Sequence, residues 1–451
     1  MIKTRKILAG LLALAMMLTV FSMAAAEQEA RKIETPADAD EWIRAFLGEH
    51  PEEMDGVWQM TVQMQKAAAA SGGMKGLAAS LATLGKAEKI SSAYAAEIQG
   101  YPAYHIPCIF TNMSVDLVLI TDQGAVAGLT TGVYTGETEA QADADTFVSA
   151  ELALPVPALN GELPGTLTLP EGDGPFPAVV LIHGSGPNDR DETVGNLKPF
   201  RDLAEGLTKQ GIAVYRFDKR TYVYGTVMAG DHQVTLTEES IEDAAAAVQL
   251  LAQQEKIDSS RIFVLGHSLG GNVIPAIDQA LKDQPVPARG YIMMAASPRP
   301  LDELMREQYD FLYSLLPEIT EEQQAEKDAM FSELDKLKEL DSMTDDDTIA
   351  GVYTPYWKWL AAYDALSAAE GITEPVLLLQ GEEDYQVTME DYAIWEKALG
   401  DRDNWTLISY PGLTHPFTAG QKTEGAAAYL RSEKVDGKVI QDIADFINRI
   451  Q

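Results

Sequence analysis

The sequence predicts an α/β protein with a mostly parallel central sheet and a helical cap insertion, preceded by a small α+β domain. Two observations predict this organisation. After about residue 147, short apolar runs alternate with segments of helical periodicity, as in a parallel sheet covered by helices. Before about residue 133, a helical region comes first and short strands follow it. The chain has 451 residues, of which 46% are hydrophobic, so it is long enough to form two cores.

The first 26 residues are predicted to be a signal peptide. A basic start over residues 3–6 precedes an apolar run over residues 7–20, and the small residues Ala24-Ala25-Ala26 fit a cleavage site. The apolar run is shorter than the roughly 20 residues that span a bilayer. We therefore expect a secreted or periplasmic protein that has no membrane association after cleavage.

Residues 27–136 are predicted to form the α+β domain. Residues 34–90 have the Ala-rich and Met-rich composition of helices. Four short apolar runs follow, punctuated by turn residues as in an antiparallel meander. These runs are Ile98–Tyr104, Ile106–Phe110, Val115–Ile120 and Ala125–Leu129. A polar linker is expected over residues 137–146.

The α/β domain is predicted over residues 147–451. It opens with a hairpin over residues 147–154 and 159–169, and apolar strands separated by helical segments follow. The predicted strands are Ala178–Ile182, Ile212–Phe217, Ile262–Leu265, Tyr291–Ala295 and Val376–Leu379. An acidic, helix-rich stretch over about residues 300–368 interrupts this alternation and is predicted to be the cap.

Charge and cysteine content exclude several classes of function. The formal net charge of −35 repels phosphate backbones and anionic lipids, so a partner of either kind is not expected. The single cysteine, Cys108, excludes an intramolecular disulfide and a cysteine-cluster zinc site. No metal is expected, because no pair of histidines has the spacing of metal ligands.

Ser268 is the predicted nucleophile. The segment Arg261–Gly271 consists of a buried-type strand that continues into Gly266-His267-Ser268-Leu269-Gly270, followed by a helical pattern. In this strand–turn–helix context, GxSxG forms a strained turn that exposes the serine hydroxyl. A GxSxG sequence outside such a context is often only a turn.

A serine nucleophile requires a base, and His415 is the predicted one. The chain has six histidines: His50, His105, His183, His232, His267 and His415. Two lie in the N-terminal domain, one lies in a glycine-rich loop, and one adjoins Ser268, where its side chain is expected to point into the scaffold. His415 follows the last apolar strand, Trp405–Ser409, and His232 is the runner-up.

Asp384 is the predicted carboxylate partner of that base. It follows the apolar strand Val376–Leu379 in an acidic turn, and its neighbours Glu382 and Glu383 are the alternatives. The N–H groups of Ser185 and Leu269 are the predicted donors of an oxyanion hole. Ser185 lies in the glycine-rich loop that follows the first predicted strand of the sheet.

The motifs HGSGPNDRDE, DKRT, GHSLGG, GEEDYQV and GLTHPF make residues from about 150 to 451 resemble the α/β-hydrolase superfamily. The resemblance is to bacterial exported serine esterases of the dienelactone-hydrolase-like and serine-aminopeptidase-like group, and a weaker one extends to the small N-terminal domain. It implies hydrolysis of carboxylic esters without a cofactor, through Ser268, Asp384 and His415. It also implies that the cap covers the nucleophile.

The aromatic end of the cap is predicted to line the substrate pocket through Tyr356, Trp357 and Trp359, with docking onto the body of the domain as the alternative. Asp189-Arg190-Asp191 and Lys219-Arg220 are interpreted as ion-pairing residues at the rim of the site.

The sequence therefore predicts an exported serine carboxylesterase. Its expected partner is a small or aromatic acyl ester, either a free small molecule or a decoration on a polysaccharide. A serine peptidase with the same acyl-enzyme chemistry is the nearest alternative. A binding protein that acts through its N-terminal domain is an alternative of another class.

Overall fold

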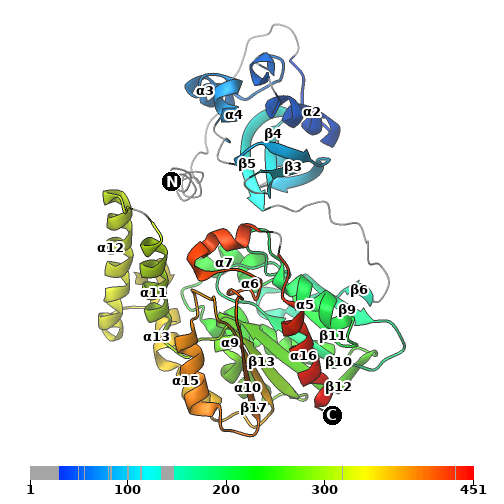
Figure 1. Cartoon of the computed structure of the whole chain (residues 1–451), viewed down its shortest axis with the longest axis vertical. Coiled ribbons are helices and arrows are strands. Elements are labelled where there is room, and N and C mark those ends of the chain that lie inside the picture. Colours follow the sequence, from blue (N-terminus) through cyan, green and yellow to red (C-terminus); the bar gives the residue numbers. More distant parts are fainter. Residues whose placement is uncertain are drawn as a thin grey trace. The chain divides into compact units, whose positions relative to one another are not determined.

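The computed structural model describes residues 30–48, 50–54, 56–79, 81, 84–98, 101–111, 114–133, 147–316, 318–431 and 433–450. The predicted signal peptide and linker lie outside these residues. The chain divides into two compact units, residues 1–142 and 143–451 (Figure 1). Within the described ranges, no helix combines the length and the apolar content needed to cross a membrane.

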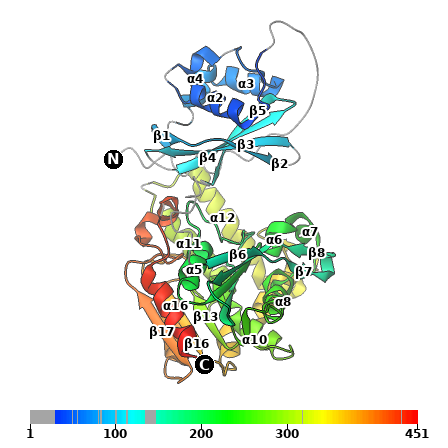
Figure 2. The same cartoon turned by 90° about the vertical axis from the view of Figure 1, so that its right-hand side faces the viewer.

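The first unit packs helices on one side of an antiparallel sheet (Figure 2). Its helices are α2 (Pro36–Phe46), η1 (Pro51–Met54), α3 (Val62–Ala70) and α4 (Met74–Ala79). Its strands are β1 (Ala87–Ile90), β2 (Tyr94–Ile98), β3 (Tyr101–Phe110), β4 (Ser114–Asp122) and β5 (Ala125–Val133). The strand order is β1-β3-β4-β5, and β2 pairs with β3. Trp42 and Phe46 of α2 stack at 4.8 Å between ring centroids within the core beneath the sheet.

Two features of this unit differ from the expectation. The segment expected as two strands on either side of His105 is the single strand β3, because His105 continues the ladder opposite Val118 of β4. A polar side chain on one face does not interrupt backbone pairing. In addition, helices were expected up to residue 90, but residues 87–90 form β1. The first strand was expected to begin at Ile98, but β2 already begins at Tyr94.

The second unit is built on an eight-stranded sheet in the order β17-β16-β13-β12-β10-β11-β9-β6. Its strands are β6 (Phe147–Glu151), β9 (Gly165–Pro170), β10 (Phe176–Ile182), β11 (Ala213–Phe217), β12 (Ile257–His267), β13 (Gly290–Met294), β16 (Val376–Gly381) and β17 (Trp405–Tyr410). In this order, the six strands from β11 to β17 are parallel to one another. Strand β9 runs antiparallel to β11, and β6 runs antiparallel to β9. The carboxyl ends of six strands therefore meet at one edge.

The two strands of the opening hairpin are shorter than expected, and the connection between them is longer. Strand β6 pairs with β9, and β7 (Leu154–Val156), η3 (Pro157–Leu159) and β8 (Gly161–Leu163) lie between them in the chain. Residues 154 and 159–163 thus belong to a separate small hairpin, in which Leu154 and Leu163 are fully buried. Burial of this hairpin against the body explains the apolar residues that suggested a continuous strand.

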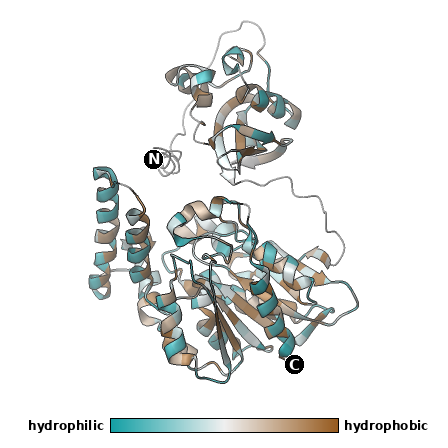
Figure 3. Ribbon diagram, in the orientation of Figure 1, coloured by the Kyte–Doolittle hydropathy of each residue, from teal (hydrophilic) through white to brown (hydrophobic). Residues whose placement is uncertain are grey.

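Helices cover both faces of the sheet (Figures 2 and 3). On one face lie α5 (Pro199–Thr208) and α16 (Gly437–Arg449), whose apolar residues form one core with the strands. On the other lie α8 (Glu242–Leu251), α10 (Ile274–Leu281) and α15 (Met389–Leu399). The hydrophobic colouring in Figure 3 is concentrated on the strands, as expected for a sheet buried on both faces.

The cap is inserted between β13 and β16. It contains α11 (Leu301–Ser314), α12 (Glu321–Asp335), η5 (Lys336–Ser342), β14 (Thr348–Ile349), β15 (Val352–Tyr353), α13 (Thr354–Ala362) and α14 (Ala365–Ala369). Figure 1 shows α11 and α12 side by side. A small core of its own stabilises the cap, and the buried members are Leu334, Leu340, Ile349 and Trp357.

Candidate active site

Ser268 stands between a strand and a helix at the carboxyl edge of the sheet. Strand β12 ends at His267, and α9 (Leu269–Asn272) begins directly after Ser268. The backbone of Ser268 has a φ of 54°, which a non-glycine residue adopts only at a cost of about 1–3 kcal/mol. Its N–H donates a hydrogen bond of 2.8 Å to the carbonyl oxygen of Met294. Surrounding structure therefore holds the strained turn that presents this serine.

Gly266 and Gly270 allow this turn to fit against β10. A Cβ atom added to Gly270 would lie 2.3 Å from the carbonyl oxygen of Ile182. A Cβ atom added to Gly266 would lie 2.2 Å from the carbonyl oxygen of Gly270. Neither distance is compatible with a side chain, so the two glycines of GxSxG are a steric requirement of the turn.

His415 and Asp384 come together from loops that follow adjacent strands. Nδ1 of His415, after β17, lies 2.6 Å from Oδ2 of Asp384, after β16. Both side chains are buried. Oδ1 of Asp384 accepts backbone hydrogen bonds from Gln386 at 2.7 Å and Val387 at 3.1 Å. These donors fix the carboxylate so that Oδ2, which also accepts a hydrogen bond of 3.3 Å from Nε2 of Gln380, faces the imidazole.

The two neighbouring carboxylates have other partners. Glu382 accepts a hydrogen bond of 2.8 Å from the Ser409 hydroxyl, and Glu383 accepts one of 3.0 Å from the backbone N–H of Lys422. The three consecutive acidic residues of this turn therefore point in different directions. Among them, the structure places only Asp384 at His415.

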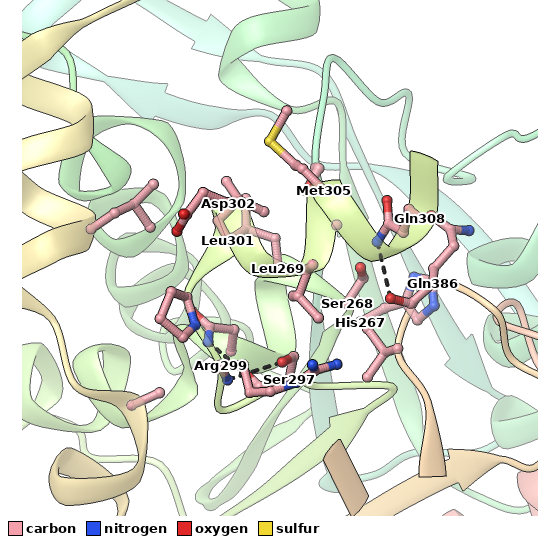
Figure 4. Close-up of a pocket in the computed structure, with 18 of the residues that line it drawn as sticks. His267, Ser268, Leu269, Ser297, Arg299, Leu301, Asp302, Met305, Gln308 and Gln386 are labelled. Carbon is pink, nitrogen blue, oxygen red and sulfur yellow. Dashed lines mark hydrogen bonds between the residues drawn. The ribbon is translucent and has the colours of Figure 1, made fainter. Parts of the chain in front are cut away.

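Ser268 and His415 line one cavity of about 790 Å³, together with Ser185 and Leu269. Figure 4 shows Ser268 and Leu269 among the residues that line it. The far wall of the cavity comes mainly from the cap. The apolar lining residues of the cap include Leu301, Leu304, Met305, Leu337, Leu340, Trp357, Leu360, Ala361 and Ala365. A space of this size with a mostly apolar wall and a few polar groups is typical of a small-molecule site.

The loop after β10 passes close to Ser268. A Cβ atom added to Gly184 would lie 3.1 Å from Cβ of Ser268. The N–H of Gly184 donates to Oε1 of Glu192 at 2.6 Å, so that group is occupied. By contrast, no described residue accepts a hydrogen bond from the N–H of Ser185 or of Leu269. These two donors remain available to a bound group.

His267 lines the cavity, but its ring nitrogens are directed into the scaffold, where the side chain forms an ion pair. Its Nδ1 atom lies 2.9 Å from Oε2 of Glu192, and its Nε2 atom lies 3.1 Å from the carbonyl oxygen of His415. Burial lowers the pKa of His267, but the Glu192 carboxylate, the His415 carbonyl and Asp384 together raise it by more, so the net direction is upward. Burial raises the pKa of Glu192, but His267, His183 and the Gly184 N–H together lower it by more, so the net direction is downward.

The contacts of two other histidines, His183 and His232, give them structural roles away from the cavity. His183 is buried against Phe200 and Phe217, and this burial lowers its pKa to about 4, so it is neutral near neutral pH. His232, the runner-up for the base, pairs with Asp346 at 2.6 Å and stacks on Tyr353. Neither histidine lines the cavity that contains Ser268.

The aromatic residues of the cap divide between two faces of α13. Trp357 lines the cavity. Tyr356 and Trp359 instead pack against the body of the domain, and Nε1 of Trp359 donates a hydrogen bond of 3.1 Å to the hydroxyl oxygen of Thr237. The structure thus places one of the three residues at the cavity and the other two in the docking contact that was the alternative.

The charged segments near the site form ion pairs with partners that the sequence did not indicate. Nε of Arg190 lies 3.1 Å from Asp218, and Nε of Arg220 lies 3.0 Å from Asp243. Asp191 pairs with Arg216. Sequence reasoning also missed Glu192 as a site residue, although it ends the HGSGPNDRDE motif that carried the resemblance.

The parallel sheet, the strand–serine–helix turn and the cap together define a hydrolase of the α/β-hydrolase fold. The family model described as serine aminopeptidase, S33, matches residues 175–420, which is more than half of the chain. The chain belongs to this family. Within the described residues, no group of three or more His, Cys, Asp or Glu side chains is placed to hold a metal ion.

Known relatives include the esterase EstD of Thermotoga maritima, which is 37% identical over 346 residues, covering 76% of this chain and 79% of EstD. Among solved structures, Est1E from Butyrivibrio proteoclasticus is 16% identical, with a TM-score of 0.42 over 66% of this chain and 98% of Est1E. The Pyrococcus furiosus esterase Pf2001 is 18% identical, with a TM-score of 0.41 over 67% of this chain and 91% of that chain. The protein is a hydrolase that acts on esters.

Proposed function

We propose that the protein is a serine carboxylesterase that forms an acyl-enzyme on Ser268. In this mechanism the Ser268 hydroxyl attacks the ester carbonyl carbon while Nε2 of His415 takes its proton. The tetrahedral intermediate then expels the alcohol, which receives that proton from His415. Water, activated by the same imidazole, hydrolyses the acyl-enzyme and releases the carboxylic acid.

The remaining roles follow from the groups around these two residues. Asp384 holds His415 in the tautomer that leaves Nε2 free and stabilises the imidazolium that forms. The N–H groups of Ser185 and Leu269 bind the developing oxyanion. The observation that carries the proposal is the 2.6 Å contact between Asp384 and His415, next to a cavity that Ser268 and His415 both line.

The cavity wall favours an ester with an uncharged, apolar acyl group. The cap contributes mostly aliphatic side chains and Trp357. The Arg299 side chain in the wall is already paired with Asp391 at 2.8 Å and also with Glu307, so it is not free to bind an anionic substrate. Small or aromatic acyl esters fit this lining, including those that decorate polysaccharides.

Substitution of Ser268 tests the mechanism. Ser268→Ala is expected to abolish hydrolysis of a short-chain nitrophenyl ester without loss of folding, because the hydroxyl supplies the nucleophile and little packing. Ser260→Ala is the matched control, since Ser260 is an exposed serine on the same strand, β12. Turnover by Ser268→Ala at the rate of the control would refute the proposal.

A peptidase activity is the second candidate. One observation favours it, because Asp302 places a carboxylate in the cavity wall, where it can bind an α-ammonium group. Parallel assays with a short-chain nitrophenyl ester and an aminoacyl anilide distinguish the two. A kcat/KM for the anilide that exceeds that for the ester would favour the peptidase.

We also propose that the protein is exported and processed before Glu27. The support is the basic start, the short apolar run and the alanines that precede this residue. Mass determination of the protein recovered from outside the producing cell is expected to give a chain that begins at Glu27. Recovery of the full-length chain from the cytoplasm alone would contradict export.

A further inference from the structure

Lys219 is a buried lysine directly behind the loop that contains Gly184 and Ser185. It follows β11 and is only 2% exposed. Its Nζ atom donates a hydrogen bond of 2.7 Å to the carbonyl oxygen of Gly184 and one of 2.5 Å to Oε1 of Glu239. Burial of an ammonium group is costly unless the group is paired and hydrogen-bonded. These two contacts therefore compensate for the burial of the Lys219 ammonium group.

The hydrogen bond from Lys219 to the carbonyl oxygen of Gly184 determines the direction in which the N–H of Ser185 points. The carbonyl of Gly184 and the N–H of Ser185 belong to one planar trans peptide, so they point in opposite directions. The carbonyl is held by Lys219 and, at 3.3 Å, by the side-chain amide of Asn188. The N–H of Gly184 is held by Glu192. Because the carbonyl and the N–H of Gly184 are both held, the N–H of Ser185 is fixed in a single orientation.

A charge-assisted hydrogen bond also polarises the peptide. An ammonium group on the carbonyl oxygen withdraws electron density from the amide, and hydrogen bonds in such a chain strengthen one another. The Ser185 N–H therefore becomes a stronger donor toward a negatively charged oxygen on the other side. Lys219 acts on this N–H without touching the substrate.

We propose that Lys219 is a positioning residue for the oxyanion hole, and that the cap keeps it in place through Glu239 and Tyr356. The inference rests on the serine-esterase mechanism proposed above. It assigns a role in catalysis to an ion pair that lies outside the cavity.

The connection to the cap runs through one short helix. Glu239 lies on η4 (Thr237–Ile241), a π-helical turn, and such turns are frequent near functional sites. Burial raises the pKa of Tyr356 on α13, and the Glu239 carboxylate near its hydroxyl raises it further. The Trp359 indole donates a hydrogen bond of 3.1 Å to the Thr237 hydroxyl on the same turn. Two side chains of the cap thus hold the segment that pairs with Lys219. The same α13 helix presents Trp357 to the cavity.

Lys219→Met tests the role, since methionine keeps most of the length and apolar stem of lysine and removes the charge. We expect kcat for a short ester to fall about 10-fold to 100-fold with KM changed less, because the loss falls on the transition state. The diagnostic readout is the ratio of kcat/KM for an ester to that for its thionoester. Sulfur is a weaker hydrogen-bond acceptor, so a well-placed N–H makes this ratio large, and Lys219→Met is expected to reduce it.

Arg220→Met is the matched control. Arg220 is the adjacent residue, is buried and forms an ion pair with Asp243, and none of its hydrogen bonds to described residues reaches the loop. The Arg220→Met variant is expected to lower the melting temperature, as Lys219→Met does. Its ratio of kcat/KM for the ester to that for the thionoester is expected to stay at the wild-type value. A general loss of structure would lower both rates together and leave the ratio unchanged.

Tyr356→Phe is a milder variant that keeps the test decisive if Lys219→Met does not fold. Loss of one hydroxyl is expected to reduce the ratio in the same direction by a smaller factor. Folded Lys219→Met or Tyr356→Phe with a wild-type ratio would overturn the inference. Retention of activity in Ser268→Ala would instead overturn the mechanism on which it rests, so the two failures are distinguishable.

Discussion

Glu192 and His267 form a buried ion pair next to the proposed catalytic base, with 2.9 Å between Oε2 and Nδ1. The other carboxylate oxygen of Glu192 accepts from the N–H of Gly184, and the other ring nitrogen of His267 contacts the carbonyl oxygen of His415. One pair therefore joins the loop that contains Ser185 to the loop that contains His415. Burial favours the neutral form of both groups, whereas their mutual attraction, with contributions from neighbouring groups, shifts the pKa of each toward its charged form.

This pair predicts a pH dependence of stability. The pKa of His267 is raised in the folded state, so its contribution is complete below the ordinary value of 6.5 and is lost as pH rises through the folded value. The pKa of Glu192 is lowered, so its contribution is present above 4.5 and is lost as pH falls through the folded value. The destabilisation caused by Glu192→Gln is therefore expected to be largest between these two values.

The measurement is the free energy of unfolding of wild type and Glu192→Gln in urea from about pH 5 to about pH 9. The difference is expected to shrink as pH rises above about 6.5. Glu242→Gln is the control, because Glu242 is half exposed and contributes a weak surface pair, so its effect is expected to be small at every pH. A difference for Glu192→Gln that grows with pH would show that the pair is not charged.

Gly270→Ala is predicted to disrupt the turn that presents Ser268. The added Cβ would lie 2.3 Å from the carbonyl oxygen of Ile182 and 2.6 Å from that of His183, so backbone must move. We expect destabilisation of about 1–3 kcal/mol or more and a large loss of ester hydrolysis. Gly437→Ala is the control, since no atom lies within 4 Å of a Cβ there and the residue begins helix α16. Wild-type activity in Gly270→Ala would contradict the close packing.

The sequence predicted the parts of the fold that depend on local pattern. Apolar runs alternating with helical periodicity identified the parallel strands, and strand–GxSxG–helix identified the turn at Ser268, because each signal lies within about ten residues. The order of the serine, the acidic turn and the last histidine along the chain then followed from the end of each strand. The structure places His415 at Asp384, and both loops start at the same edge of the sheet.

Partners distant in sequence could not be predicted in this way. Lys219 meets Gly184 and Glu239, and Glu192 meets His267, across separate segments of the chain, and no periodicity encodes those distances. The choice among three consecutive carboxylates was also open, since the backbone of the turn decides which side chain faces the imidazole.

The aromatic residues of the cap illustrate a third limit. On a helix, residues three apart share a face, so Tyr356 and Trp359 lie together and Trp357 lies on another face with Leu360. The sequence contains this division, but it does not say which face meets the cavity. That depends on how α13 packs on η4, through the contact between Trp359 and Thr237.

Trp357 is predicted to control acyl selectivity, whereas Trp359 is not. Trp357 lines the cavity, so Trp357→Leu enlarges the space for the acyl group and is expected to raise kcat/KM for a bulky aromatic ester relative to acetate by about 10-fold. Trp359→Leu removes a similar volume from a contact outside the cavity. It is expected to lower both kcat/KM values alike, through the η4 segment that holds Glu239 and Lys219. Purified variants assayed on the two esters give the ratio directly. A ratio that responds to Trp359→Leu and not to Trp357→Leu would place the acyl group on the other side of α13 and refute this assignment of the pocket.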